Sequence, residues 1–459
     1  MPHAALAQIL EPAGVEPPLP DELSISGADP VFRTSYRVGT AGAAALAALG
    51  LAAARLWLRR GGRAQKIAVD VAAAAASLRS TAYLRVDGKR RSEMWDPLSG
   101  FYPVSDGSIR FHCNFPVHRD AAFGVLGVAQ ERQAGEAASR GWRGEALEDA
   151  IHAAGGCAGY VRSAADWARH PQAQAVAAQP LIEIVRIGDA PPEPLPAAAR
   201  PLSGVRVLDL TRVLAGPTCA RSLAEHGADV LKISAAHLPD SGAVELDTGI
   251  GKLSARLDLR EQEGVDTLRA LAREADVFSQ SYRPGALAAR GFSPEALAAL
   301  RPGIVCVSLS AWGASGPWRM RRGFDSIVQS VSGMAQASAG ADSKPRLLPV
   351  SAIDYVSGYL MAFGAMLALE RRAREGGSWL VRVALARVGK WIADLGTVDA
   401  GTAADDLPPE ALGRLLTEID SPAGRIIHLR PVLEMSETPP RWDRPPVPLG
   451  HHAPQWPPR

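Results

Sequence analysis

Asp354 stands directly before a long apolar stretch that predicts a helix. A helix N-terminus supplies unpaired N–H groups and partial positive charge, which favour an ionised carboxylate. An ionised carboxylate that a ligand can reach can attack an activated acyl group as a nucleophile. Asp is also a favoured N-cap residue, so a purely structural capping role is the alternative at this position.

Arginines occur in two predicted loops. Arg283-Pro284-Gly285 comes after the predicted strand Asp276–Ser279, and Arg321-Arg322 comes after Gly316-Pro317. Guanidinium groups make bidentate, charge-assisted bonds with phosphate, so these loops suit a polyphosphate ligand. Exposed arginines without a ligand are the alternative.

The loop Thr211–Pro217 follows the predicted buried strand Val205–Leu210. Ligands of α/β proteins usually bind at the carboxyl ends of strands. The loop lacks the GxGxxG pattern, and the next strand (Asp229–Ile233) is followed by Ser234 rather than an acid, which disfavours a dinucleotide site. An ordinary strand-to-helix connection is the alternative.

Strands and helices alternate after residue 203, which predicts an α/β fold: a Rossmann-like, doubly wound, mostly parallel sheet. The further elements predicted there are Thr218–His226, Gly264–Ala275, Ser293–Leu300 and Ile304–Ser310. A smaller α+β domain is expected before them. It has a strand pair within Asp96–Asn114 and helices at Leu147–Gly156 and Ser163–Ala178.

A weak internal repeat relates Arg37–Ala72 to Ala352–Ala386. Each copy has a small-residue-rich helix, arginines, a Gly-Gly stop and a strand. Counting back from Gly-Gly, Gly39 occupies the position of Asp354, so the first copy lacks the acid. The expected division is an N-terminal arm (1–34), a degenerate helix–strand copy (35–80), a small domain (81–189), a Pro-rich linker (190–202), a catalytic domain (203–400) and a Pro-rich tail (401–459).

Composition narrows the possible partners. Lys plus Arg number 50 against 48 Asp plus Glu, without a basic stripe, which argues against nucleic acid. The four cysteines are widely spaced and offer no metal-ligand pattern, so no metal is expected and a reducing cytoplasm is favoured. Val38–Ala54 is uncharged but consists mainly of Ala and Gly, so a buried helix is expected rather than a membrane span.

Taken in order, these segments resemble the family III (CaiB/BaiF-type) CoA-transferases. The resemblance covers nearly all of Pro201–Trp391. The matching segments are PLSGVRVLDLTRVLAGPTCARSLAEHGADVLKIS, GKLSARLDL, ADVFSQSYRPGALAARGF, RPGIVCVSLSAWGASGP, RRGFDSIVQSVSG and SAIDYVSG, with SETPPRWDRPPVPLGHH in the tail.

The resemblance implies that Asp354 is the catalytic residue and that coenzyme A is the acyl carrier. The positions that it implies for CoA binding are Leu214, Ala215, Leu257, Asp258, Arg260, Ser281, Arg283, Arg322, Phe324 and Asp325. Two positions depart from the family pattern: Ser234 replaces an acid and Ser281 replaces an Asn. The order of the domains also departs from that of ordinary members. The segment that resembles the family's small domain (Phe101–Gln172) precedes the region that resembles the catalytic domain. The chain therefore looks like a permuted or trimmed tandem.

The implied reaction moves CoA from an acyl-CoA to a carboxylic acid through an aspartyl anhydride and an aspartyl-CoA thioester. A homodimer is implied as possible, because ordinary members form interlocked dimers. Two alternatives stay open: a catalytically silent CoA-binding or partner subunit, and an acyl-CoA racemase or epimerase. Racemases place a histidine in a G-H-D stretch, where this chain has Gly323-Phe324-Asp325, and Phe cannot transfer a proton.

Overall fold

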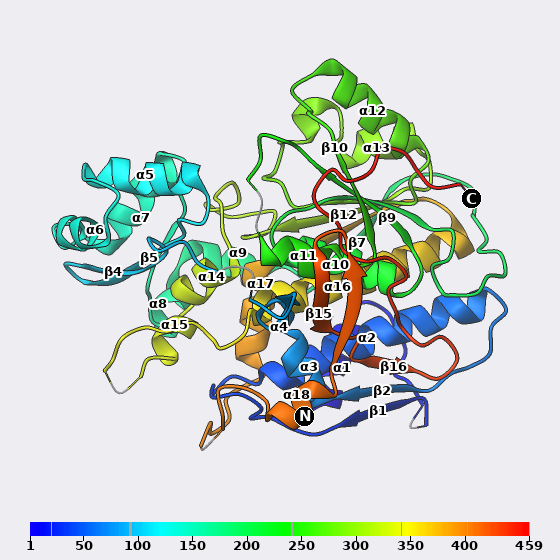
Figure 1. Ribbon diagram of the computed structural model, residues 1–459, viewed down its shortest axis with the longest axis horizontal. Coiled ribbons are helices and arrows are strands. Elements are labelled where there is room, and N and C mark those ends of the chain that lie inside the picture. The colour runs from blue at the N-terminus through cyan, green and yellow to red at the C-terminus, as the bar shows by residue number, and fades with distance from the viewer. Residues whose placement is uncertain (20, 91–93, 240–241, 341, 402, 459) are drawn as a thin grey trace.

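The computed structural model describes residues 1–19, 21–90, 94–239, 242–340, 342–401 and 403–458. Its largest described sheet has seven strands in the order β10-β9-β8-β11-β12-β13-β7 (Figure 1). Strands β8 to β13 pair in parallel, and β7 pairs antiparallel with β13 at one edge. The predicted α/β fold with a mostly parallel sheet is confirmed.

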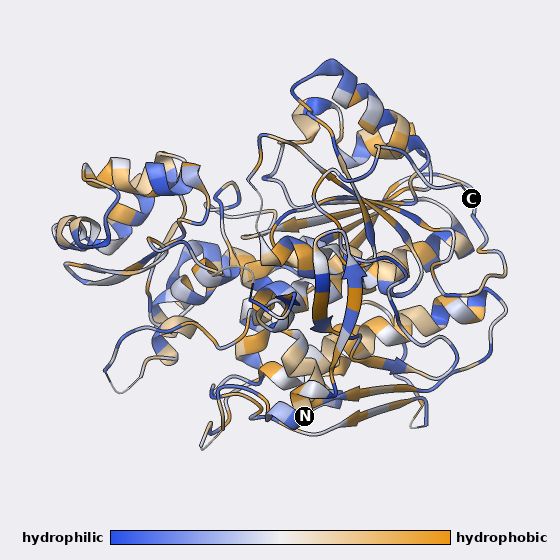
Figure 2. Cartoon of the chain, viewed as in Figure 1, coloured by the Kyte–Doolittle hydropathy of each residue, from blue (hydrophilic) through white to orange (hydrophobic). Residues whose placement is uncertain are grey.

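The parallel strands are short, most of them are apolar, and both faces of the sheet are covered. Successive residues point to opposite faces, so Val207 and Leu208 belong to different core clusters. Helices α10 (Ala215–Glu225) and α16 (Ala352–Glu375) contribute to the first cluster, and α12 (Gln262–Arg273) and α13 (Pro294–Leu300) to the second. The outer helix α12 shows both hydrophilic and hydrophobic residues (Figure 2), as expected for a helix with one buried face. The parallel strands are β8 (Arg206–Leu210), β9 (Asp229–Ser234), β10 (Lys252–Arg256), β11 (Val277–Gln280), β12 (Val305–Ser310) and β13 (Ser378–Ala384).

Three differences from the sequence expectation concern the large sheet and the helix that follows its first strand. The helix expected at Thr218–His226 begins earlier, at Ala215. Strand β10 was not predicted, because its residues Lys252–Arg256 include two cations. Strand β7 (Glu183–Gly188) precedes the Pro-rich stretch and yet joins the large sheet. The large sheet therefore includes chain from both sides of the expected linker.

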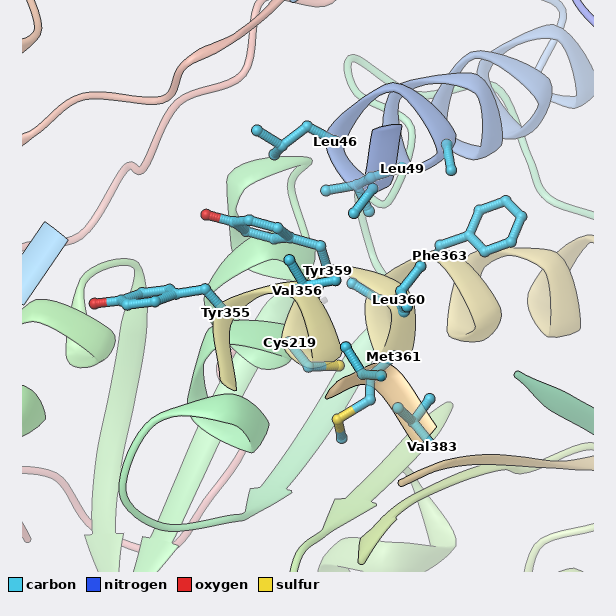
Figure 3. Packing of buried hydrophobic residues seen from close by; sticks show 14 of the residues in the cluster. Leu46, Leu49, Cys219, Tyr355, Val356, Tyr359, Leu360, Met361, Phe363 and Val383 are labelled. Atoms are coloured by element: carbon cyan, nitrogen blue, oxygen red, sulfur yellow. The ribbon is translucent and has the colours of Figure 1, made fainter. Parts of the chain in front are cut away.

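Helices α2 (Val38–Arg59) and α16 pack against each other in the centre of the molecule. Figure 3 shows Leu46 and Leu49 of α2 facing Tyr359, Leu360 and neighbouring residues of α16. Among the described helices, these two are long and apolar enough to cross a membrane, and the most apolar windows of α2 and α16 are 78% and 100% buried. Small residues let the helix backbones approach closely, which agrees with the buried helix expected at Val38–Ala54.

The start of α2 has no room for the acid that the repeat lacks. The N–H groups of Gly39 and Thr40 donate to the Asp29 carboxylate at 3.0 and 2.7 Å. A Cβ atom on Gly39 would lie 2.7 Å from both Asp29 Oδ1 and Val71 Cγ1. The first copy therefore retains the helix but has neither the acid nor the space for one.

A small α+β lobe projects to the left in Figure 1. Tyr102, Phe111, Phe123 and Leu147 are among the residues of its separate core. Its sheet contains β4 (Gly100–Val104), β5 (Gly107–Phe111) and β6 (Ala158–Tyr160), with helices α5 (Pro116–Leu126), α6 (Arg132–Ser139) and α7 (Gly144–Ala153). Helices α8 (Ala164–Arg169), α9 (Pro171–Ala177), α14 (Asp325–Val331) and α15 (Met334–Ala337) lie beside and below this lobe in Figure 1.

The C-terminal segment returns to the N-terminal elements in two small sheets. One sheet has the order β1-β2-β16 and joins Leu23–Ser26, Ile67–Asp70 and Leu433–Met435. The other has the order β14-β15-β3 and joins Leu416–Ser421, Gly424–Leu429 and Arg85–Val86. The remaining helices are α1 (Pro2–Leu10), α3 (Val71–Ser77), α4 (Ser80–Tyr83), α11 (Ala243–Gly249), η1 (Ala288–Arg290), α17 (Leu385–Asp394) and α18 (Pro409–Gly413).

Candidate active site

A cavity of about 670 Å³ opens beyond the carboxyl ends of β8, β11 and β12. Strand order reverses between β8 and β11, since β9 and β10 extend to one side of β8 and β12 and β13 to the other side of β11. Ligands of open α/β sheets bind in the crevice at such a switch point. The topology therefore places this cavity where a ligand site is expected.

The loop between β8 and α10 forms part of the cavity wall. Val213 has φ 68°, a left-handed conformation that is strained for a β-branched residue. Leu214 is the N-cap of α10, and both Leu214 and Ala215 line the cavity. Lys252 joins the two ends of this loop. Its Nζ donates to Asp209 Oδ2 in β8 and to the Pro217 carbonyl in α10, each at 2.7 Å.

Five arginines line this cavity: Arg212, Arg283, Arg319, Arg321 and Arg322. Arg321 pairs with Asp149, with 2.5 Å between Nη2 and Oδ1. Within the described ranges, no salt bridge joins any of the other four to an acid. Burial, followed by the charge of Arg283, lowers the pKa of Arg322. Cations held together without counter-charges make a site for a polyanion.

Asp354 lies at the junction of this cavity and a second one of about 600 Å³, since it lines both. It is the third residue of α16, after the N-cap Ser351, rather than the residue before the helix. Asp325 Oδ2 accepts the Asp354 N–H at 3.1 Å and thereby caps α16 from the start of α14. Among the described residues, no hydrogen bond engages the Asp354 carboxylate itself. The capping alternative for Asp354 is therefore wrong, because Asp325 provides the cap.

The surroundings of Asp354 oppose the ionisation that the helix N-terminus was expected to favour. Burial, and then the negative charge of Asp325, raise the pKa of Asp354 well above its ordinary value. Burial likewise raises the pKa of Asp325 to about 6, although the N–H of Asp354 and the side chain of Gln329 act in the opposite direction. Because like charges repel in a buried site, ionisation of either of the Asp354 and Asp325 carboxylates disfavours ionisation of the other. Cationic residues or ligands brought into either cavity would favour the ionised form of Asp354.

This electrostatic cost predicts that Asp354→Asn stabilises the fold, increasingly as pH rises. Below the unfolded-state pKa of about 4, the carboxyl group is neutral in both states and costs nothing. Between that pH and the raised folded-state pKa, the unfolded chain has released the proton while the folded chain still holds it, so each pH unit in this window costs the folded wild type about 1.4 kcal/mol, and the cost levels off above the folded-state pKa. Asn does not titrate, so the melting-temperature difference between Asp354→Asn and wild type should grow as pH rises above about 4 and should level off once the folded-state pKa is passed.

Asp258→Asn is the matched control, because hydrogen bonds from Arg260 lower the pKa of Asp258, the opposite direction. That variant should gain no stability at any pH. A difference between Asp354→Asn and wild type that stays constant across the pH range would contradict the assigned electrostatics.

The other predicted positions divide into two groups. Leu214, Ala215, Ser281, Arg283, Arg322 and Phe324 line the first cavity together with Asp354, and Asp325 lines the second with it. Leu257, Asp258 and Arg260 line neither cavity. Leu257 is buried in the second core cluster, and Arg260 is bonded to Asp258, with Nη2 2.6 Å from Oδ2. Asp258 Oδ2 lies 3.5 Å from Nδ1 of His237, which lines the first cavity.

Sequence reasoning missed the contribution of the small lobe to this site. His118, at the start of α5, lines the first cavity, and His112, just after β5, lines the second. Burial and then the charge of Arg322 lower the pKa of His118 to about 4. Arg212 and Arg319 were also missed. Arg212 lies inside the predicted loop Thr211–Pro217, so its position could have identified it.

Comparison with known proteins shows which family residues 202–415 resemble. Residues 202–415 match the model of CoA-transferase family III. A probable fatty acyl-CoA transferase (Rv3272) of Mycobacterium tuberculosis is 32% identical over 41% of this chain and 51% of its own length. The succinyl-CoA–L-malate CoA-transferase alpha subunit of Chloroflexus aurantiacus is 34% identical over 40% of this chain and 46% of its own.

A crystal structure of the Mycobacterium tuberculosis protein aligns at 30% identity with a TM-score of 0.41, covering 43% of this chain and 59% of that one. The chain spans about half the length of the curated relatives that it matches. The similarity to CoA-transferase family III therefore lies in residues 202–415 of the chain.

Proposed function

We propose that this protein is a CoA-transferase in which Asp354 carries the acyl group and then CoA. The observation that carries the proposal is the position of Asp354, which lines both cavities and makes no side-chain hydrogen bond within the described part of the chain. One cavity has the charge for the phosphates of CoA. The other gives an acyl group or an acceptor acid access to the same carboxylate.

The chemistry balances without a redox partner or a net proton. An Asp354 oxygen bonds to the thioester carbon as its C–S bond breaks, which gives a mixed anhydride and CoA thiolate. The thiolate then bonds to the Asp354 side-chain carbon, releasing the first carboxylate and leaving an aspartyl-CoA thioester. The acceptor carboxylate attacks this thioester to form a second anhydride. Thiolate attack on the acceptor's acyl carbon yields the new acyl-CoA and free Asp354.

The proposed division of labour follows the two lobes. Residues 203–400 supply the arginine cavity and Asp354, and the small domain at 81–189 supplies part of the wall of both cavities. Two relatives are named as CoA-transferases for succinyl-CoA with L-malate and for succinyl-CoA with glutarate. We propose the same general classes here, an acyl-CoA donor and a carboxylic acid acceptor, for a cytoplasmic enzyme that can form a homodimer.

Removal of Arg322 should weaken CoA binding by about 10- to 100-fold. One charge-assisted phosphate bond contributes about 1.5–3 kcal/mol, and Arg322 has no acid partner in the described ranges to absorb its charge. Calorimetric titration of Arg322→Ala with free CoA measures the loss. The salt dependence of binding should weaken at the same time, because screening acts on these contacts.

Arg260→Ala is the informative comparison, because the family resemblance implies a CoA contact at Arg260, whereas here Arg260 is paired with Asp258 and lines neither cavity. Its CoA affinity should stay within about twofold of wild type, since an exposed ion pair contributes little. Equal affinities for Arg322→Ala and wild type would remove the first cavity as the phosphate site.

The racemase alternative requires a proton-transfer group where that subgroup carries histidine. This chain has Phe324 at that position, and Phe cannot transfer a proton. A covalent CoA adduct separates the transferase from both alternatives. A racemase exchanges a proton without such an adduct, and a silent CoA-binding subunit binds CoA only reversibly.

A further inference from the structure

His112 is a buried histidine without a hydrogen-bond partner for its ring. It follows β5 in the small lobe, and its side chain is almost fully buried, with an exposed fraction of 4% for the residue. Neither Nδ1 nor Nε2 has a partner within the described ranges. An unsatisfied buried polar group costs about 1–3 kcal/mol, so such a group in a ligand cavity calls for a functional account.

Aromatic packing fixes the His112 ring. It stacks on Phe324 with centroids 3.7 Å apart and planes 9° apart. Trp95 approaches it edge-on, at 5.8 Å and 86°. Phe324 is the residue just before Asp325, so the small lobe places an imidazole directly on the segment that caps α16 and neighbours Asp354.

His112 lines the second cavity together with Asp325 and Asp354. Burial, and then the charges of His118 and Arg110, hold its pKa well below the ordinary value. The imidazole is therefore neutral at physiological pH, with one ring N–H as donor. A neutral imidazole can stabilise developing negative charge without competing for the proton of a carboxylic acid.

We propose that His112 donates a hydrogen bond from its neutral ring to the carbonyl oxygen that becomes an oxyanion when Asp354 exchanges acyl groups. The inference rests on the proposed function of Asp354 and adds a catalytic residue to it. As the new bond forms at the carbonyl carbon, the C=O electron pair moves onto oxygen, where the ring N–H stabilises it. The pair returns when the leaving group departs. His112 neither gains nor loses a proton, so its role continues through both half-reactions.

The test compares His112→Phe with wild type in the rate of covalent CoA adduct formation on Asp354. Phe keeps a flat ring to stack on Phe324 but cannot donate a hydrogen bond. Removing one oxyanion donor lowers rates by about 10²- to 10³-fold, and the adduct should form more slowly by that factor. Rapid-quench mass spectrometry at saturating acyl-CoA measures the rate, and calorimetry with free CoA should show unchanged affinity.

His226→Phe is the matched control. His226 follows α10, is 1% exposed and also has both ring nitrogens unpartnered among the described residues, but it lines neither cavity. This variant should form the adduct at the wild-type rate. A general loss caused by replacing any buried histidine would affect both variants alike and would overturn the assignment.

A second variant covers the case in which His112→Phe does not fold. His112→Gln retains an N–H donor that does not titrate, so its rate relative to wild type should be constant from pH 6 to pH 9. A ratio that changes with pH would overturn the neutral-donor role, as would equal adduct rates in wild type and folded His112→Phe. Failure of wild type itself to form an adduct would instead contradict the proposed function.

Discussion

Asp354→Asn is expected to lower CoA transfer by a factor on the order of 10⁴ or more, because losses of this size follow removal of a covalent nucleophile. Asn is nearly the same size but is a very poor nucleophile. The cap of α16 stays in place, since it is formed by Asp325 with the backbone N–H of residue 354. CoA should bind with near-wild-type affinity, because the cavity arginines are untouched. Steady-state assays with a panel of acyl-CoAs and acids measure the rate.

Asp258→Asn provides the activity control, as it removes a carboxylate outside both cavity linings. Its turnover should stay close to that of the parent protein. A folded Asp354→Asn protein that transfers CoA at the parental rate would remove Asp354 from the mechanism.

The largest loss of stability is expected from Asp247→Ala, which should lower the free energy of unfolding by about 3–5 kcal/mol. Asp247, in α11, is 1% exposed and accepts bonds from Ser80 Oγ at 2.6 Å and Thr81 Oγ1 at 3.1 Å. Its Oδ2 also lies 3.0 Å from Nη1 of Arg221, which is itself buried. Removal leaves the Arg221 charge buried without its acid. The variant therefore tests whether the N-terminal segment that carries Ser80 and Thr81 is anchored to the catalytic region.

Glu410→Ala is the matched control for that experiment. It breaks the pair of Arg414 with Glu410, whose side chains are 74% and 81% exposed, so the loss should be below about 1 kcal/mol. Urea unfolding of both variants measures the difference. Equal losses would show that the buried network does not hold the two parts together.

The large sheet could be predicted from the sequence because its information is local. Apolar runs such as Val205–Leu210 are bounded by turns and separated by helical periodicity, and these patterns fix the alternation of strands and helices. The position of β7 could not be predicted, because its pairing with β13 joins segments almost 200 residues apart. Local patterns carry no information about such partners.

The candidate site divides in the same way. Asp354, Arg283 and Arg322 could be found because each stands at the end or the start of a predicted element. The electrostatic state of Asp354 could not, since it depends on Asp325, 29 residues earlier in the chain. His112 also could not be found, because only the tertiary structure stacks it on Phe324 and leaves its ring without a partner.

Mass spectrometry of the wild-type protein after incubation with a panel of acyl-CoAs measures directly whether Asp354 carries CoA covalently. Proteolytic peptides should show CoA joined covalently to the peptide that contains Asp354, and the same peptide from Asp354→Asn should carry no adduct. The adduct should disappear when an acceptor carboxylic acid is added, because transfer regenerates the free side chain. Turnover of an acyl-CoA without any adduct on Asp354, or an adduct on another residue, would contradict the account.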